Sequence, residues 1–136
     1  MNSRAFCVAR GLALALLTLG LSAVQAQVEI RESQGVSYLA GGVGIEEREA
    51  VQKLEHFFNL KLTFAQRDGH FIGDVKVRIT TPQGDPVTEI DANGPLLYVV
   101  LPVGSYRVEA SFGAQPQQRE VSLKAAPAKT TVTFFW

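Results

Sequence analysis

The sequence predicts a mainly β protein, a seven-stranded antiparallel β-sandwich with one N-terminal amphipathic α-helix packed on a sheet face. From Leu60 onward, apolar and polar residues alternate, which is typical of strands with one buried and one exposed face. Glycine, proline, asparagine and aspartate separate these runs at short intervals, as they do in sandwiches. Before Leu60, residues 45–58 instead repeat apolar side chains at helical spacing.

The first 26 residues have the features of a secretory signal peptide that is cleaved after Ala26. Arg4 and Arg10 provide the positively charged start, and the apolar run of residues 11–21 follows. The alternative is a membrane anchor, but this run is shorter than the roughly 20 residues that a spanning helix needs. Cys7 precedes the apolar run, which argues against a lipoprotein. We therefore expect export to the periplasm.

Cleavage would change the composition of the protein. Removal of 26 of the 136 residues leaves 110, and it takes away the single cysteine and two of the 13 basic residues. The 11 remaining basic residues face 13 acidic ones, so the net charge becomes −2. The loss of cysteine excludes a disulfide framework and a thiolate zinc site. The slight acidity gives no basis for nucleic-acid binding. We expect no cofactor and no transmembrane span after cleavage.

An N-terminal extension, residues 27–58, precedes the sandwich domain of residues 59–136. Within the extension, residues 36–40 alternate as a short strand would, and the glycines of residues 41–44 end that pattern. We interpret these glycines as a turn that lets the chain approach the sheet closely. The alternative is an anion cradle before a helix, which the glutamates that follow disfavour.

The helix predicted over residues 45–58 is amphipathic, with glutamates in its first turns, where the helix dipole favours negative charge. Asn59 is the predicted C-terminal stop of this helix. The apolar stripe and the residues beside it are Ile45, Ala50, Val51, Leu54, Phe57 and Phe58.

One predicted strand breaks the alternation, because residues 96–101 are apolar on both faces. A helix with an apolar stripe must bury that stripe somewhere. We therefore expect the helix to cover the outer face of the sheet that contains residues 96–101. The seven predicted strands are residues 60–66, 73–81, 86–90, 95–101, 104–113, 118–124 and 129–136.

The stretch Leu101-Pro102-Val103-Gly104-Ser105-Tyr106-Arg107-Val108 resembles the LPxGxYxV signature of carboxypeptidase regulatory-like domains. Residues 75–87 are similar to the opening strand, glycine turn and second strand of that family. The resemblance covers residues 59–136 and implies a transthyretin-like (prealbumin-like) sandwich. It also implies an accessory, non-catalytic role, and it makes homo-oligomeric assembly through sheet edges one alternative.

The first functional hypothesis is an exported, non-catalytic module that binds an unknown periplasmic protein or other ligand. Loops on a rigid scaffold often carry recognition, so we expect the binding surface in residues 67–73, 82–86, 91–95 and 113–117. No catalytic, cofactor-binding or metal-binding residue is predicted. The residues proposed for the binding surface are Tyr38, His70, Phe71, Asp85, Asp91 and Tyr98.

The alternative is a small secreted hydrolase or metal-dependent enzyme of unrecognised type. It would use His56 or His70 with a carboxylate from Asp68, Asp74 or Asp91. The sequence has no paired-histidine metal motif and no G-x-S-x-G nucleophile elbow to support it. A calcium site built on two of the loop aspartates, at positions 85 and 91, is a further alternative without the usual loop motif.

Overall fold

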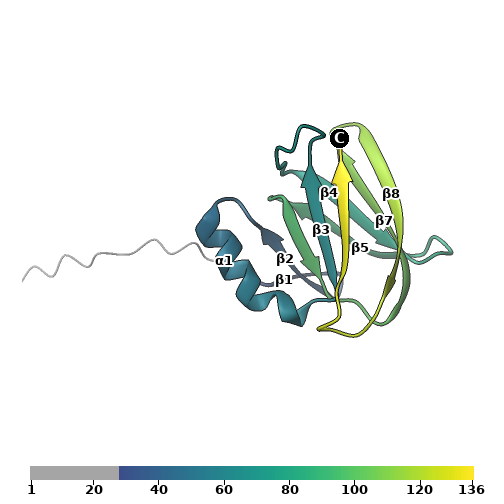
Figure 1. The fold of residues 1–136 in the computed structure, drawn as a ribbon. Helices are drawn as coiled ribbons and strands as arrows, with labels where there is room; N and C mark the ends of the chain where they lie inside the picture. The colour runs from purple at the N-terminus through teal and green to yellow at the C-terminus, as the bar shows by residue number, and fades with distance from the viewer. Residues whose placement is uncertain (1–27) are drawn as a thin grey trace, which may run out of the picture.

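A computed structural model describes residues 28–136, so the predicted signal peptide and its cleavage site lie outside the described residues. The protein is mainly β, as predicted, with two packed sheets and one helix (Figure 1). The described residues form nine strands, so the prediction of seven was wrong in number. All seven predicted strands are present with shifted ends, and the two additional strands belong to the N-terminal extension.

The first sheet has five strands in the order β1-β2-β6-β3-β9. Its two additional strands, β1 and β2, form a hairpin around Gln34 and Gly35, whose positive φ angles of 51° and 80° suit a type I′ turn. β1 has only three residues, Arg-Glu-Ser, so it leaves no apolar alternation to find in the sequence. The strands are β1 (Arg31–Ser33), β2 (Val36–Gly41), β3 (Leu60–Ala65), β6 (Leu96–Val99) and β9 (Thr130–Phe135).

One strand pair in this sheet is parallel, which corrects the prediction of a fully antiparallel sandwich. β9 runs parallel to β3 over its whole length, from Thr130 opposite Leu60 to Phe135 opposite Ala65. Figure 1 shows the two as neighbouring arrows that point the same way. Alternation predicts which face of a strand is buried, but it carries no information about the direction of a neighbour that is distant in sequence.

The second sheet has four antiparallel strands in the order β5-β4-β7-β8. β8 begins at Gln115, so residues 113–117 are not the predicted loop, and the β7–β8 turn lies at Gly113 and Ala114. Pro116 therefore lies within a strand rather than in a turn. The strand tolerates it because β8 is at the edge of the sheet. The strands are β4 (Val75–Thr80), β5 (Pro86–Ala92), β7 (Gly104–Phe112) and β8 (Gln115–Leu123).

The helix covers the outer face of the five-stranded sheet, as expected (Figure 1). It consists of α1 (Ile45–Leu54) and a 3₁₀ turn, η1 (Glu55–Phe57), rather than one α-helix over residues 45–58. Val51 and Phe58 are buried against Tyr98 of β6 and Leu39 of β2. The apolar stripe is narrower than predicted, because Ile45 is 73% exposed and Phe57 is 53% exposed.

The main core lies between the two sheets and is made of the inward-facing residues of both. Leu60, Leu62 and Phe64 of β3 face Val77 and Ile79 of β4 within this core. At the end of the sandwich that carries the C-terminus, the aromatic rings of Phe64, Phe112, Phe134 and Trp136 pack together, with centroids about 6 Å apart.

Asn59 is a buried connector between strands and not the predicted stop signal of the helix. Its amide nitrogen donates to the carbonyl oxygens of Leu101 (2.7 Å) and Lys124 (2.9 Å). Its side-chain oxygen accepts from the backbone N–H of Leu101 at 3.0 Å. The side chain therefore joins the segment after η1 to the chain that follows β6 and to the chain that follows β8.

Candidate functional site

The loops that were predicted to form a binding surface lie at two opposite ends of the sandwich. Pairing of Val75 with Ala92, and of Lys76 with Ser111, places residues 66–74, 93–95 and the 113–114 turn at the end that carries the C-terminus. The turn at residues 81–85 lies at the other end. Asp85 precedes β5 and Asp91 is its penultimate residue, so most of the strand separates them, a distance of about 20 Å at about 3.3 Å per residue. These two aspartates therefore cannot share a calcium ion.

Tyr98 is not a surface anchor, which corrects its proposed role. Its side chain is 1% exposed, because it points to the outer face of the sheet, where the helix covers it. Its hydroxyl donates to Glu55 Oε2 at 3.4 Å, and the same carboxylate lies 3.6 Å from the ammonium of Lys129. Burial, followed by the negative charge of Glu55, raises the pKa of Tyr98 to about 12.

Tyr38 is half-buried and packs against the main core from the opposite face of the sheet.

His70 forms a pair with Asp68 in the β3–β4 loop. The Nδ1 atom of His70 lies 2.9 Å from Asp68 Oδ2, and the backbone N–H of His70 donates to Asp68 Oδ1 at 3.0 Å. These contacts hold the pKa of Asp68 below its usual value, the backbone hydrogen bond being the largest cause. Both side chains are open to solvent, 79% exposed for His70 and 58% for Asp68. His56 lies apart from them, exposed on η1 with its ring 4.0 Å from that of Phe57.

Phe71 is the predicted surface aromatic that is exposed, at 53%. Its backbone forms an isolated bridge with Ala65 at the end of β3. The guanidinium of Arg48 on α1 lies 4.9 Å from the centre of its ring, in cation–π geometry. Phe71 therefore links the β3–β4 loop to the helix while it keeps about half of its surface in solvent.

The glycines of residues 41–44 form the predicted close turn. A Cβ atom on Gly94 would lie 2.5 Å from the carbonyl oxygen of Gly41, so the two chains meet at backbone distance. Gly42 has a φ of 97°, which disfavours any side chain there. Its N–H donates to Glu47 Oε1 at 3.1 Å, so a carboxylate of the helix itself occupies the position that an anionic ligand would take.

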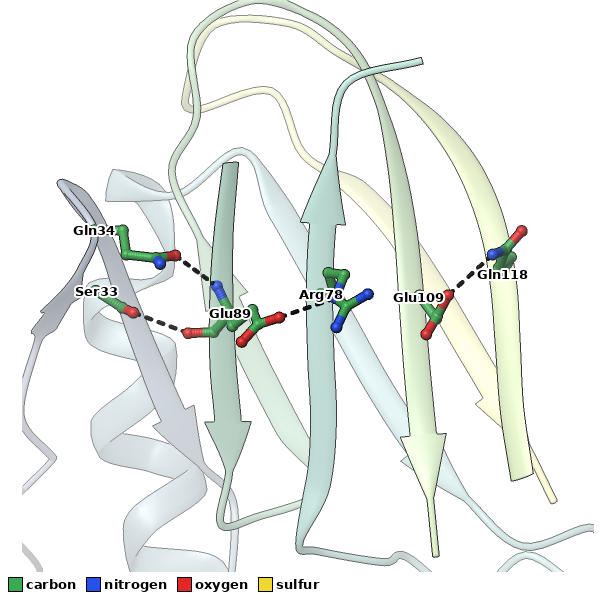
Figure 2. Close-up of polar contacts among 6 residues, drawn as sticks. All are labelled: Ser33, Gln34, Arg78, Glu89, Glu109 and Gln118. Carbon is green, nitrogen blue, oxygen red and sulfur yellow. Dashed lines mark hydrogen bonds and ion pairs between the residues drawn. The ribbon is translucent and has the colours of Figure 1, made fainter. Parts of the chain in front are cut away.

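The outer face of the four-stranded sheet carries a row of polar contacts that runs across the strands. Figure 2 shows this row from Gln34 and Ser33, in and beside the β1–β2 turn, through Glu89 and Arg78, to Glu109 and Gln118. Arg78 Nε donates to Glu89 Oε1 at 2.9 Å, and Gln118 donates to Glu109 at 3.0 Å. The β1–β2 hairpin is fixed to this sheet through the backbone of Glu89. The Ser33 hydroxyl donates to the backbone carbonyl of Glu89 at 2.8 Å. The backbone N–H of Glu89 donates to the side-chain oxygen of Gln34 at 3.0 Å.

This face is hollowed into a depression of about 510 Å³ that is lined by side chains of β4, β5 and β7. The hairpin forms one rim through Ser33 and Gln34, and the lining includes Lys76, Asp91 and Ser111. Of the residues proposed from the sequence, Asp91 is part of it, while Phe71, His70 and Asp85 are not. The alternation in β4 and β7 predicted that these polar side chains are exposed. It did not predict the rim, because the rim comes from a hairpin packed from the other sheet.

The part of the chain that the structure describes holds no group of three or more histidine, aspartate or glutamate side chains arranged for a metal ion. Among the same residues, no helix is both long and apolar enough to span a membrane. Comparison with known proteins found no matching family model and no matching curated protein.

Proposed function

We propose that this protein is an exported, non-catalytic binding module whose ligand surface is the hollowed outer face of the four-stranded sheet. The observation that carries the proposal is the polar depression rimmed by the β1–β2 hairpin. Figure 2 shows the polar contacts on this face. The helix covers much of the corresponding face of the other sheet. The similarity of residues 101–108 to a family of accessory, prealbumin-like domains supports the same role.

The depression suits a polar ligand. Arg78, Glu89 and Glu109 are held in place by contacts with their neighbours, so a ligand would meet charges that are already oriented. Charges of both signs that are fixed in this way favour specificity and correct orientation of a partner. The lining residues include no aromatic ring, which favours a polar, charged partner over a flat apolar one.

Capture of partners by the mature protein tests this role. Asp91→Asn and Glu109→Gln alter the depression, and both are expected to reduce the yield of a partner captured from periplasmic extract by about tenfold or more. Asp85→Asn is the matched control, because Asp85 is an exposed carboxylate outside the depression. Capture that is unchanged in the first two variants, or equally reduced in the control, would contradict the proposal.

Export has its own test. The N-terminus of the protein purified from a periplasmic fraction is expected to be Gln27, the residue that follows the proposed cleavage site. Peptide sequencing of the intact protein reads this directly. A product that retains Met1 and stays in the cytoplasmic fraction would show that the N-terminal segment is not a cleaved signal.

The enzymatic alternative depends on the Asp68–His70 pair, in which a histidine lies within hydrogen-bond distance of a carboxylate. The pair lies on an open loop, where water would screen it, and this favours the binding role. A screen with activated esters decides between them. We expect no turnover above that of the His70→Ala variant, and turnover that His70→Ala abolishes would establish a catalytic role.

A further inference from the structure

Two smaller hollows adjoin the main depression and extend it around the end of β5. The hollow of about 300 Å³ beside Asp74 shares Lys76 and Asp91 with the main depression. The hollow of about 150 Å³ lies between the two sheets and shares Asp91 with the main depression. It also shares Asn93 with the hollow beside Asp74. The three therefore form one trough, with Asp91 at their junction. The trough runs from the outer face of the four-stranded sheet to the gap between the sheets.

The trough is negatively charged. Its lining contains three basic side chains, and one of them, Arg78, is already paired with Glu89. Arg31 lies 4.0 Å from Glu29, and Lys76 is the cross-strand neighbour of Asp91. Carboxylates exceed cations by three in the trough, whereas they exceed cations by one in the sheet-face depression alone, so the trough has the stronger negative charge. The six carboxylates belong to Glu29, Glu47, Asp74, Glu89, Asp91 and Glu109.

A second, independent feature of the trough is an open strand edge. β5 is at the edge of its sheet, and the backbone N–H and C=O of Glu89 point outward, where Gln34 and Ser33 bind them. In an antiparallel strand every second residue points its backbone groups the same way, so Asp91 directs its N–H and C=O to the same edge. Within residues 28–136 the hairpin contacts end at Glu89, and the edge at Asp91 opens into the trough.

We propose that the trough binds an extended polypeptide segment that contains several lysine or arginine residues. The backbone of this segment would pair with Asp91 at the edge of β5, which is the recognition mode of strand addition. Its cationic side chains would approach the carboxylates of Asp74 and Asp91 on one side and Glu47 on the other. The inference rests on the proposed function, since both use this face, and it adds the chemistry of the partner.

Fluorescence anisotropy with a labelled peptide of alternating lysine and serine tests the inference on the mature protein. We expect this peptide to bind and the matching glutamate–serine peptide not to bind. Affinity is expected to fall as NaCl rises from about 0.05 M to about 0.3 M, because salt screens exposed charges. The double variant Asp74→Asn/Asp91→Asn should weaken binding by about tenfold. Methylation of the peptide backbone nitrogens should weaken it further, because it removes the donors for strand addition.

The matched control is Asp85→Asn/Glu49→Gln, which removes the same number of charges from exposed positions outside the trough. Equal weakening by the control would show attraction to net charge alone and would overturn the inference. Insensitivity to backbone methylation would overturn strand addition. If the lysine peptide fails to bind while Glu109→Gln still reduces partner capture, the proposed function stands and only the basic peptide is wrong.

Discussion

At the scale of single residues, Asn59 shows how one side chain can fix the ends of three segments. It is 1% exposed, and its amide satisfies a buried N–H and two carbonyl groups of the chain. Buried backbone groups of this kind have no access to water if the amide is removed, so their desolvation is uncompensated.

Asn59→Ala is expected to lower the free energy of unfolding by about 2–4 kcal/mol, because it leaves both backbone groups of Leu101 without their partner. Urea denaturation followed by circular dichroism measures the change. Asn93→Ala is the control, since Asn93 is exposed, and it should change the same quantity by less than about 0.5 kcal/mol. A small effect at position 59 would mean that water replaces the amide.

The buried hydroxyl of Tyr98 makes the stability of the protein sensitive to alkaline pH. The pKa of Tyr98 is about 12 in the folded protein and about 10 in the unfolded chain. Between these values the unfolded chain has lost the proton and the folded protein keeps it. The stabilisation is therefore fully present below about pH 10 and is lost as the pH rises through 12.

Tyr98→Phe should remove this part of the pH dependence, because phenylalanine keeps the ring under the helix and has no proton to lose. We expect thermal denaturation of the natural protein to steepen in its pH dependence above about pH 10, and that of the variant to do so less. At pH 7 the two should differ by no more than about 1 kcal/mol, because the lost hydrogen bond is long at 3.4 Å. Identical pH profiles would contradict the assignment.

At the scale of elements, the helix is attached to the sheet through few side chains. Val51 is the one fully buried residue of α1, and Phe58 after η1 completes the contact with Leu39 and Tyr98. Polar contacts at both ends supplement this small apolar area. Arg48 lies over Phe71 near the N-terminus of the helix, and Glu55 contacts Tyr98 and Lys129 at the other end.

Val51→Ala is expected to reduce the free energy of unfolding by about 1–2 kcal/mol, since it removes two buried methyl groups. Ile45→Ala removes more apolar volume from the same helix, yet it should cost less than about 0.5 kcal/mol because Ile45 is 73% exposed. Chemical denaturation of the two variants compares them directly. The reverse order would mean that Ile45, rather than Val51, makes the main contact of α1 with the sheet.

At the scale of the whole molecule, contacts between the sheets protect the exposed edges of the sandwich. On one side, the β1–β2 hairpin binds the backbone of Glu89 at the edge of β5. On the other side, Gln117 of β8 donates to the carbonyl of Phe135, and the Thr130 hydroxyl donates to the carbonyl of Ser122 at 3.1 Å. Covered edges are less available for pairing with other chains, which protects a β protein from aggregation.

The single tryptophan reports on the closure of this sandwich. Trp136 packs on Phe64, Phe112 and Phe134, and its indole donates to the carbonyl of Gln115 at 2.9 Å. We expect tryptophan fluorescence and far-ultraviolet circular dichroism to show one coincident unfolding transition in urea, because β9 pairs with β3 in one sheet and is hydrogen-bonded to β8 of the other through side chains. A fluorescence transition at lower urea would show that β9 detaches before the rest of the molecule unfolds.

The sequence by itself determined the buried and exposed faces of the strands, the presence of the helix and its place on the sheet that contains β6. These follow from local periodicity, because each apolar face must find cover. The tertiary structure alone decided the parallel pairing of β9 with β3 and the rim that turns a polar sheet face into a trough. Each of these depends on contacts between segments far apart in the chain, such as Ser33 with Glu89, and local patterns carry no record of such contacts.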